Sequence, residues 1–319
     1  MKTLLCQLIF CIVLCGCQTS THAPASMPGA CDTTLHRDAP GTGLRHFTGG
    51  FTTNDGLTLF YQGWQPEDTV RAVVCLVHGL GEHSGRYARY AALLCMHGFA
   101  VISFDLRGHG RSMGQRGHFP TFNIALDDIS LFEKKALALY PGKPLFLYGH
   151  SLGGNFVINY SLRRHSSVAG VIASAPFLKA AFKPPAWKMV LGNVMNVLWP
   201  TFSMANGLLA ENAARDTSVQ QSMKKDPLMH DRITARFMSV FEAGTWALAH
   251  ADELKVPLLL MHGSADRITS EPASAQFAQK AGSLCTFKVW PGFFHQIHDE
   301  PGNQAVVEYV TAWMESRMR

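Results

Sequence analysis

Short apolar runs alternate with helical patterns over most of the chain, and this alternation constrains the fold more than any other feature. Apolar runs that end at turn-forming residues predict strands at residues 57–64, 72–77, 100–104, 144–148, 168–173, 256–261 and 285–290. Helical spacing predicts helices at residues 87–96, 119–140, 155–163, 270–280 and 303–318. Such alternation is typical of a mainly parallel sheet with helices on both faces. The sequence therefore predicts an α/β fold.

Residues 176–250 interrupt the alternation with helical patterns and no convincing buried strand. The clearest helix there is AWKMVLGNVMNVLW at residues 186–199, which stops at Pro200. An insertion between two strands of such a sheet is expected to cover the carboxyl edge, where these folds bind ligands. We therefore predict a helical cap at about residues 176–250.

The first 17 residues, MKTLLCQLIFCIVLCGC, carry one Lys and then a short apolar run. That run is too short to span a bilayer and is typical of a signal peptide. Its end, LCGC, resembles a bacterial lipoprotein signal, which implies residues 1–16 as the signal and a lipid on Cys17. An ordinary secreted protein, cut at another small residue, is the alternative. Under the lipoprotein reading, Gln18 favours a cell-envelope protein anchored in the outer membrane of a Gram-negative bacterium.

Residues 17–45 are rich in Thr, Ser, Ala, Pro and Gly without apolar periodicity, a composition that predicts a flexible tether. Cys31 lies in it as a free or intermolecularly paired thiol, whereas Cys75, Cys95 and Cys285 fall inside core-like elements and are interpreted as packing residues. The folded domain is predicted at residues 46–319.

The composition excludes two classes of protein. A hydrophobic share of 47% excludes a largely disordered chain. The 28 Lys and Arg residues and the 23 Asp and Glu residues give a net charge of only +5. No basic run stands out, so a nucleic-acid partner is not expected. The sequence carries no signal for an oligomeric state.

Gly149-His150-Ser151-Leu152-Gly153 matches the pattern G-x-S-x-G. It directly follows the strand PLFLY and opens a helix, the context that exposes a nucleophilic serine on a tight turn. A second match surrounds Ser112, but it lies in a glycine-rich loop apart from any strand. We therefore predict Ser151 as the nucleophile and Ser112 as a loop residue.

A serine nucleophile needs a base and an acid that orients the base. In such folds both follow late strands, in the order Ser, acid, His. Asp266 follows the strand VPLLLM, and His295 follows CTFKVW, with His298 as the reserve for the base. The other carboxylates weighed for the acid are interpreted as solvated cap or loop groups: Asp216, Asp226, Asp231 and Asp252.

The negative oxygen of the reaction intermediate needs backbone donors. The amide of Leu152, directly after the nucleophile, is one candidate. The other is the amide of Leu80, because flanking glycines in the loop after the strand AVVCLV let it turn toward the site. This mechanism needs no metal and no organic cofactor.

Five segments resemble the monoacylglycerol lipase and lysophospholipase branch of the α/β-hydrolases. They are HGLGEHSGRY at residues 78–87, FDLRGHGRS at 104–112, GHSLGG at 149–154, HGSAD at 262–266 and residues 292–300. The resemblance runs from about Phe51 to the C-terminus and implies the same roles for Ser151, Asp266 and His295. It also implies that Glu82, Arg86 and His298 line the polar end of the substrate pocket.

By this resemblance the chain is expected to be a serine ester hydrolase that releases fatty acid from single-chain lipids, above all monoacylglycerols. The resemblance further implies that the cap docks on a membrane through an apolar surface that includes Trp187, Met189, Met195, Leu198 and Trp199. About half of these side chains are expected to pack on the sheet instead. Two alternatives stay open: a lysophospholipase or short-chain carboxylesterase, and a surface lipoprotein that binds a lipid or a partner without catalysis.

Overall fold

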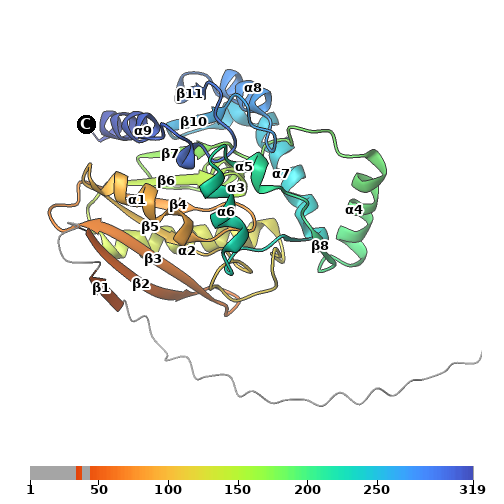
Figure 1. The fold of residues 1–319 in the computed structure, drawn as a ribbon, viewed down its shortest axis with the longest axis horizontal. Helices are drawn as coiled ribbons and strands as arrows, with labels where there is room; N and C mark the ends of the chain where they lie inside the picture. Colours follow the sequence, from red (N-terminus) through yellow and green to blue (C-terminus); the bar gives the residue numbers. More distant parts are fainter. Residues whose placement is uncertain (1–33, 38–43, 319) are drawn as a thin grey trace, which may run out of the picture. The chain divides into compact units, whose positions relative to one another are not determined.

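A nine-stranded sheet forms the centre of the protein in the computed structural model, which describes residues 34–37 and 44–318 (Figure 1). Its strand order is β1-β2-β3-β5-β4-β6-β7-β10-β11. The strands are β1 (Thr34–Arg37), β2 (Leu44–Thr52), β3 (Thr58–Pro66), β4 (Ala72–Val77), β5 (Phe99–Phe104), β6 (Leu145–His150), β7 (Gly170–Ser174), β10 (Leu258–Gly263) and β11 (Cys285–Trp290). From β5 to β11 all neighbouring strands are parallel, whereas β1, β2 and β3 pair antiparallel. The predicted α/β fold is confirmed.

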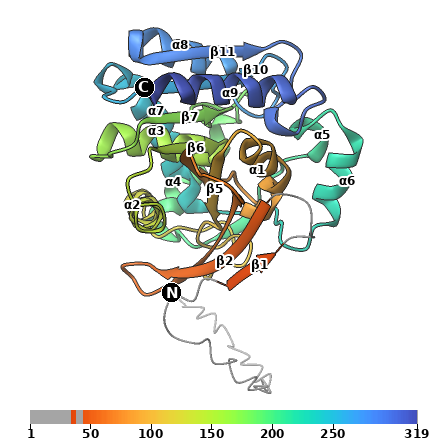
Figure 2. The same cartoon turned by 90° about the vertical axis from the view of Figure 1, so that its left-hand side faces the viewer.

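Helices cover both faces of the sheet, because the buried strands alternate their apolar side chains between two cores. In β4, Val73, Cys75 and Val77 face one core, while Val74 and Leu76 face the other. The first core is closed by α2 (Phe122–Leu139), α3 (Leu152–Arg163), α7 (Met238–Ala249) and α8 (Glu271–Ala281). The second is closed by α1 (Ala88–Cys95) and α9 (Gln304–Arg317). Figure 2 shows α1 and α2 on opposite sides of the sheet.

The stretch between β7 and α7 holds α4 (Ala186–Leu198), β8 (Ser203–Ala205), α5 (Ala210–Ala213), α6 (Thr217–Lys225) and β9 (Arg232–Thr234). The expectation of a purely helical insertion is wrong in one respect, because β8 and β9 pair as a two-stranded antiparallel sheet. Residues 238–249 form α7, whose Val240, Ala243 and Ala247 are buried, so this part of the predicted cap completes the helix layer. Among the described residues, no helix combines the length and apolar character needed to cross a membrane.

The range predicted for the flexible tether extends too far along the chain. Residues 34–37 form β1 and pair with β2, which already begins at Leu44, so both strands overlap the range predicted as flexible up to residue 45. Backbone pairing, which composition does not reveal, gives these polar residues their structure. The predicted signal, Cys17 and Cys31 lie outside the described residues. Cys75 and Cys95 are buried free thiols, as predicted, and Cys285 is a half-buried one.

Candidate active site

Ser151 occupies the single residue between β6 and α3. Its backbone has φ 53° and ψ −113°, a combination that costs energy for a non-glycine residue and persists only where the surroundings enforce it. The neighbouring glycines allow the turn: a Cβ on Gly149 would lie 2.3 Å from the carbonyl oxygen of Gly153, and one on Gly153 would lie 2.1 Å from that of Val77. The serine is thus held at the sheet's carboxyl edge, at the start of a helix.

Asp266 lies three residues after β10, and its side chain is fully buried. Its Oδ1 accepts hydrogen bonds from the amides of Ile268 (2.7 Å) and Thr269 (3.1 Å). Its Oδ2 accepts one from the Thr269 hydroxyl (2.7 Å). Burial alone would raise the pKa of this carboxyl, but the rings of His295 and His262 beside it lower the pKa below its ordinary range. Asp266 is therefore an ionised, fixed acceptor.

His295 follows β11, and its Nδ1 lies 2.7 Å from Oδ2 of Asp266. This hydrogen bond places the proton on Nδ1 and leaves Nε2 as the free base. His298, the reserve for this role, is buried, and neither of its ring nitrogens has a hydrogen-bond partner among the residues that the structure describes. Its ring stacks on that of Tyr87, with the ring centroids 4.7 Å apart. The geometry selects His295 over His298 as the base.

The loop after β4 is fastened by His78. Nε2 of this buried ring accepts a hydrogen bond from the amide of Leu106 (2.9 Å), so Nδ1 carries the proton and donates to the carbonyl of Gly79 (2.7 Å). The ring thereby holds the two residues before the predicted donor Leu80, which itself borders the same pocket as Ser151. Leu152 opens α3, and first-turn amides of a helix have no partner within the helix.

Ser112, in the second G-x-S-x-G match, is a structural residue. Its Oγ accepts a hydrogen bond from the amide of Phe60 (2.9 Å) and donates to the carbonyl of Asp105 (2.5 Å). Both of these partners are backbone groups. The hydroxyl is thus used to fasten the loop to β3, as the sequence context predicts.

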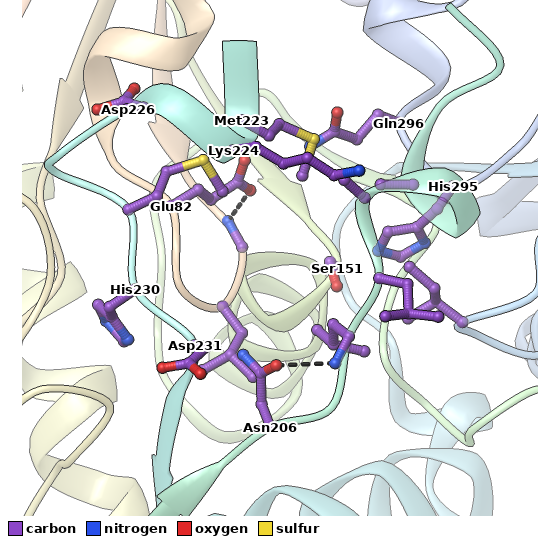
Figure 3. A pocket seen from close by; sticks show the side chains of 18 of the residues that line it. Glu82, Ser151, Asn206, Met223, Lys224, Asp226, His230, Asp231, His295 and Gln296 are labelled. Carbon is purple, nitrogen blue, oxygen red and sulfur yellow. Dashed lines mark hydrogen bonds between the residues drawn. The ribbon is translucent and has the colours of Figure 1, made fainter. Parts of the chain in front are cut away.

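A pocket of about 460 Å³ opens over Ser151, a volume ordinary for a small-molecule site (Figure 3). Ser151, His295 and Glu82 all border it. Leu208, Leu209, Ala210, Ala213, Met223, Met229 and Ile268 give it apolar walls. Most of these come from the cap, so the cap encloses the site that the sheet edge presents.

Of the three residues expected at the polar end of the pocket, only Glu82 lines it. Its Oε1 accepts hydrogen bonds from the amide of Gly79 (2.5 Å) and the hydroxyl of Tyr87 (2.9 Å). The structure does not place Arg86 or His298 among the lining residues. Arg86 donates instead to Ser222 of α6 (2.7 Å).

The sequence reasoning missed the polar residues that the cap contributes. Asp226 and Asp231, interpreted as solvated groups, line the pocket together with Asn206, Lys224 and His230. A backbone hydrogen bond joins this part of the cap to the loop after β4, since the His230 amide donates to the Gly81 carbonyl (2.9 Å). No motif marks such residues, because only folding of the insertion over the sheet edge brings them to Ser151.

Comparison with known proteins is consistent with this geometry. Residues 68–302 match the hydrolase family described as serine aminopeptidase, S33. A monoacylglycerol lipase of Mycolicibacterium smegmatis is 30% identical over 266 residues, 82% of this chain and 95% of that protein. An uncharacterized abhydrolase domain-containing protein of Dictyostelium discoideum is 34% identical over 272 residues, 83% of this chain but only 28% of that protein's length.

Solved structures give the same result. The crystal structure of a monoacylglycerol lipase from Paleococcus ferrophilus superposes with a TM-score of 0.75 at 35% identity, covering 81% of this chain and 99% of that one. A monoglyceride lipase from Saccharomyces cerevisiae, in complex with a substrate analogue, superposes at 0.73 with 20% identity, covering 92% of this chain and 98% of that one, and shares the fold.

Proposed function

This chain belongs to the serine aminopeptidase S33 family of α/β-hydrolases, and we propose that it is a monoacylglycerol lipase with Ser151 as its nucleophile. One observation carries the proposal: the strained turn of Ser151 borders the same pocket as His295, whose Nδ1 is bound to the buried Asp266. A serine hydroxyl, a base and a fixed acid are the groups that acyl transfer requires.

In the proposed reaction, Oγ of Ser151 attacks the ester carbonyl while Nε2 of His295 removes its proton. The amides of Leu80 and Leu152 donate to the negative oxygen that forms, and Asp266 stabilises the imidazolium. His295 then protonates the leaving glycerol. Water, activated by the same ring, hydrolyses the acyl-enzyme and releases the fatty acid.

The pocket supports a single-chain lipid as the substrate. Its apolar walls, with Leu208, Leu209 and Met223, suit an acyl chain, whereas Glu82 offers a carboxylate near the nucleophile. Oε2 of Glu82 is buried and has no hydrogen-bond partner within the part of the chain that the structure describes. A buried acceptor of this kind favours a substrate hydroxyl, and glycerol supplies one.

The test is hydrolysis of a monoacylglycerol by the purified protein, together with labelling by a serine-directed fluorophosphonate. We expect one label per chain on Ser151 and the loss of both labelling and hydrolysis in Ser151→Ala. The matched control is Ser112→Ala, which changes the serine of the second G-x-S-x-G match and should keep the label. A folded wild-type protein that takes up no label would instead favour a binding protein without catalysis.

We also propose that the mature chain begins at Cys17, carries lipid there and works at the cell envelope, in the outer membrane of a Gram-negative bacterium. The support is the sequence LCGC at the end of a short apolar run. Cys17→Ala should move the protein from the membrane fraction to the soluble fraction after lysis and washing at high salt. Retention of the variant with the membranes would contradict the lipid anchor.

A further inference from the structure

Carboxylates dominate the polar lining of the pocket. Glu82, Glu211, Asp226 and Asp231 all border it, whereas the only lysine or arginine among its lining residues is Lys224. Lys224 is itself paired with Glu211, and both side chains are partly exposed to solvent. In the view of Figure 3, the side chains of Glu82, Asp226 and Asp231 lie on the side of Ser151 opposite His295. These three carboxylates therefore lie beyond the nucleophile, away from the proposed base.

The deeper carboxylates are held in place by their partners. Oε1 of the buried Glu82 receives two hydrogen bonds, while its Oε2 has none. Asp226 lies 2.8 Å from Nε2 of His83. Burial opposes its ionisation, but the hydrogen bonds from His83 and from the Leu228 amide prevail and lower its pKa. At neutral pH Asp226 is therefore ionised.

Two histidines that line the pocket, His150 and His230, do not offset this charge. Burial is the main cause that lowers the pKa of His230 to about 4, and it lowers that of His150 well below the ordinary value. Both rings are neutral at pH 7. The Arg86 guanidinium lies behind the wall and interacts with Asp299 (3.8 Å) and Ser222. Asp231, at the exposed rim, adds a further negative charge.

We propose that this carboxylate wall makes the pocket selective for single-chain lipid esters with an uncharged head, and that it rejects lipids whose head carries a phosphate. The proposal rests on the proposed lipase function and assigns its substrate class. A phosphate placed beside these carboxylates suffers like-charge repulsion in a partly desolvated site. Its ionised oxygens also cannot donate to Oε2 of Glu82, whereas a free glycerol hydroxyl can.

The experiment compares two substrates with the same acyl chain, a monoacylglycerol and the corresponding lysophosphatidic acid, at low mole fraction in micelles of a nonionic detergent. For the wild-type protein we expect a kcat/KM about a hundredfold higher on the monoacylglycerol. Added NaCl should narrow this ratio, because salt screens the repulsion at the open mouth.

Removing a negative charge and removing the positive charge from the pocket should change the substrate preference in opposite directions. Asp231→Asn and Glu211→Gln should each raise the relative kcat/KM on lysophosphatidic acid by about threefold to tenfold, while Lys224→Gln should lower it. The matched control is Glu308→Gln, which removes an exposed carboxylate on α9 and should leave the ratio unchanged.

The outcomes separate the two proposals. A protein that hydrolyses neither substrate and takes up no fluorophosphonate label contradicts the lipase function itself. A protein that hydrolyses the monoacylglycerol but accepts lysophosphatidic acid equally well overturns only the charge selection. The charge selection is also overturned if the pocket variants and Glu308→Gln give the same ratio of kcat/KM on the two substrates.

Discussion

At the level of single residues, the acid of the site depends on Thr269. This buried side chain donates its hydroxyl to Oδ2 of Asp266, the oxygen that also receives Nδ1 of His295. We expect Thr269→Val, which keeps the shape and removes the donor, to lower kcat about tenfold, the equivalent of one hydrogen bond to a charged group. KM should stay within about twofold, because a positioning residue acts on the transition state rather than on binding.

Steady-state kinetics of Thr269→Val and Thr269→Ser separate this role from a packing role. Serine restores the hydroxyl but not the methyl group, so it should recover most of the lost kcat. A normal kcat in Thr269→Val together with a loss in Thr269→Ser would show that the methyl group, not the hydroxyl, matters.

The turn around Ser151 depends on Gly153. A Cβ there would approach the carbonyl of Val77 to 2.1 Å, and backbone cannot yield as a side chain can. Gly153→Ala should lower the free energy of unfolding by about 3 kcal/mol or more through overpacking. The control is Gly142→Ala, whose φ of +74° is strained but whose Cβ meets nothing within 4 Å, so it should cost only about 1–2 kcal/mol. Urea denaturation of both variants measures the difference, and equal losses would contradict the close approach.

The three proposed catalytic residues could be predicted because each lies at or shortly after the carboxyl end of a parallel strand. Parallel strands bring these ends to one edge of the sheet, where Ser151, Asp266 and His295 are therefore expected to lie together. Arg86 and His298 were placed in the pocket by resemblance alone, and the structure puts both outside its lining. Position after a strand is a physical constraint, whereas the direction of a loop side chain depends on what packs against it.

At the level of elements, α4 is unusual because none of its residues is buried, although most are apolar. Trp187, Val190, Val197 and Leu198 are between 63% and 79% exposed. Of the five cap residues named for the apolar surface, Trp187, Leu198 and Trp199 are exposed, whereas Met189 and Met195 are half-buried. Figure 1 shows α4 at the periphery of the molecule. An apolar surface of this kind on an enzyme for lipid esters supports the proposed docking on a membrane.

Replacing Val197 and Leu198 together by Ser tests that docking. The two side chains should contribute about 1.5 kcal/mol or more each when they enter lipid, so binding to phosphatidylcholine vesicles should weaken at least tenfold. Stability should hardly change, since neither side chain is buried. Vesicle sedimentation measures the binding, and Met96→Ser is the control because that methionine, directly after α1 and outside the cap, is 78% exposed. Equal binding of the wild-type protein and the double variant would refute the docking role.

The elements that the sequence predicted are those that the core determines. The strands at residues 72–77 and 285–290 were predicted to the residue: β4 is an apolar run that is buried throughout, and β11 is a half-buried edge strand whose polar and apolar residues alternate. The strands β1, β2, β8 and β9 were missed. The first two are polar or interrupted by Gly49 and Gly50, and the last two have three residues each. Such strands form through pairing with a neighbour, which local sequence does not specify.

At the level of the whole molecule, six histidines with lowered pKa lie in or near the core. Four are at most 2% exposed, and His118 and His230 are half-buried. Burial is the main cause in each case, and it lowers the pKa of His230 to about 4. The six are His78, His109, His118, His150, His230 and His298. The fold around the site therefore requires these rings to be neutral, so the free energy of unfolding must depend on pH.

The direction of that dependence follows from proton linkage. In the unfolded chain a histidine takes up a proton near pH 6.5, while these rings bind it only at lower pH, so unfolding takes up protons between about pH 6.5 and 4. The stabilisation is complete above pH 6.5 and is lost as the pH falls, by at most about 1.4 kcal/mol per pH unit for each ring. Asp55, whose pKa is lowered to about 2 chiefly by Arg107, begins to lose its contribution only below about pH 4. Asp55 therefore does not contribute to the change in stability between about pH 6.5 and 4.

We accordingly expect the free energy of unfolding in urea to fall by more than 2 kcal/mol between pH 7.0 and 5.5, since several rings each contribute over these 1.5 pH units. The control is His165→Asn, because this exposed histidine has no part in the buried set and its replacement should leave the pH dependence unchanged. His109→Asn, in contrast, removes one buried ring and should reduce the slope. A free energy of unfolding that is the same at both pH values would show that the buried rings are protonated in the folded protein, contrary to their surroundings.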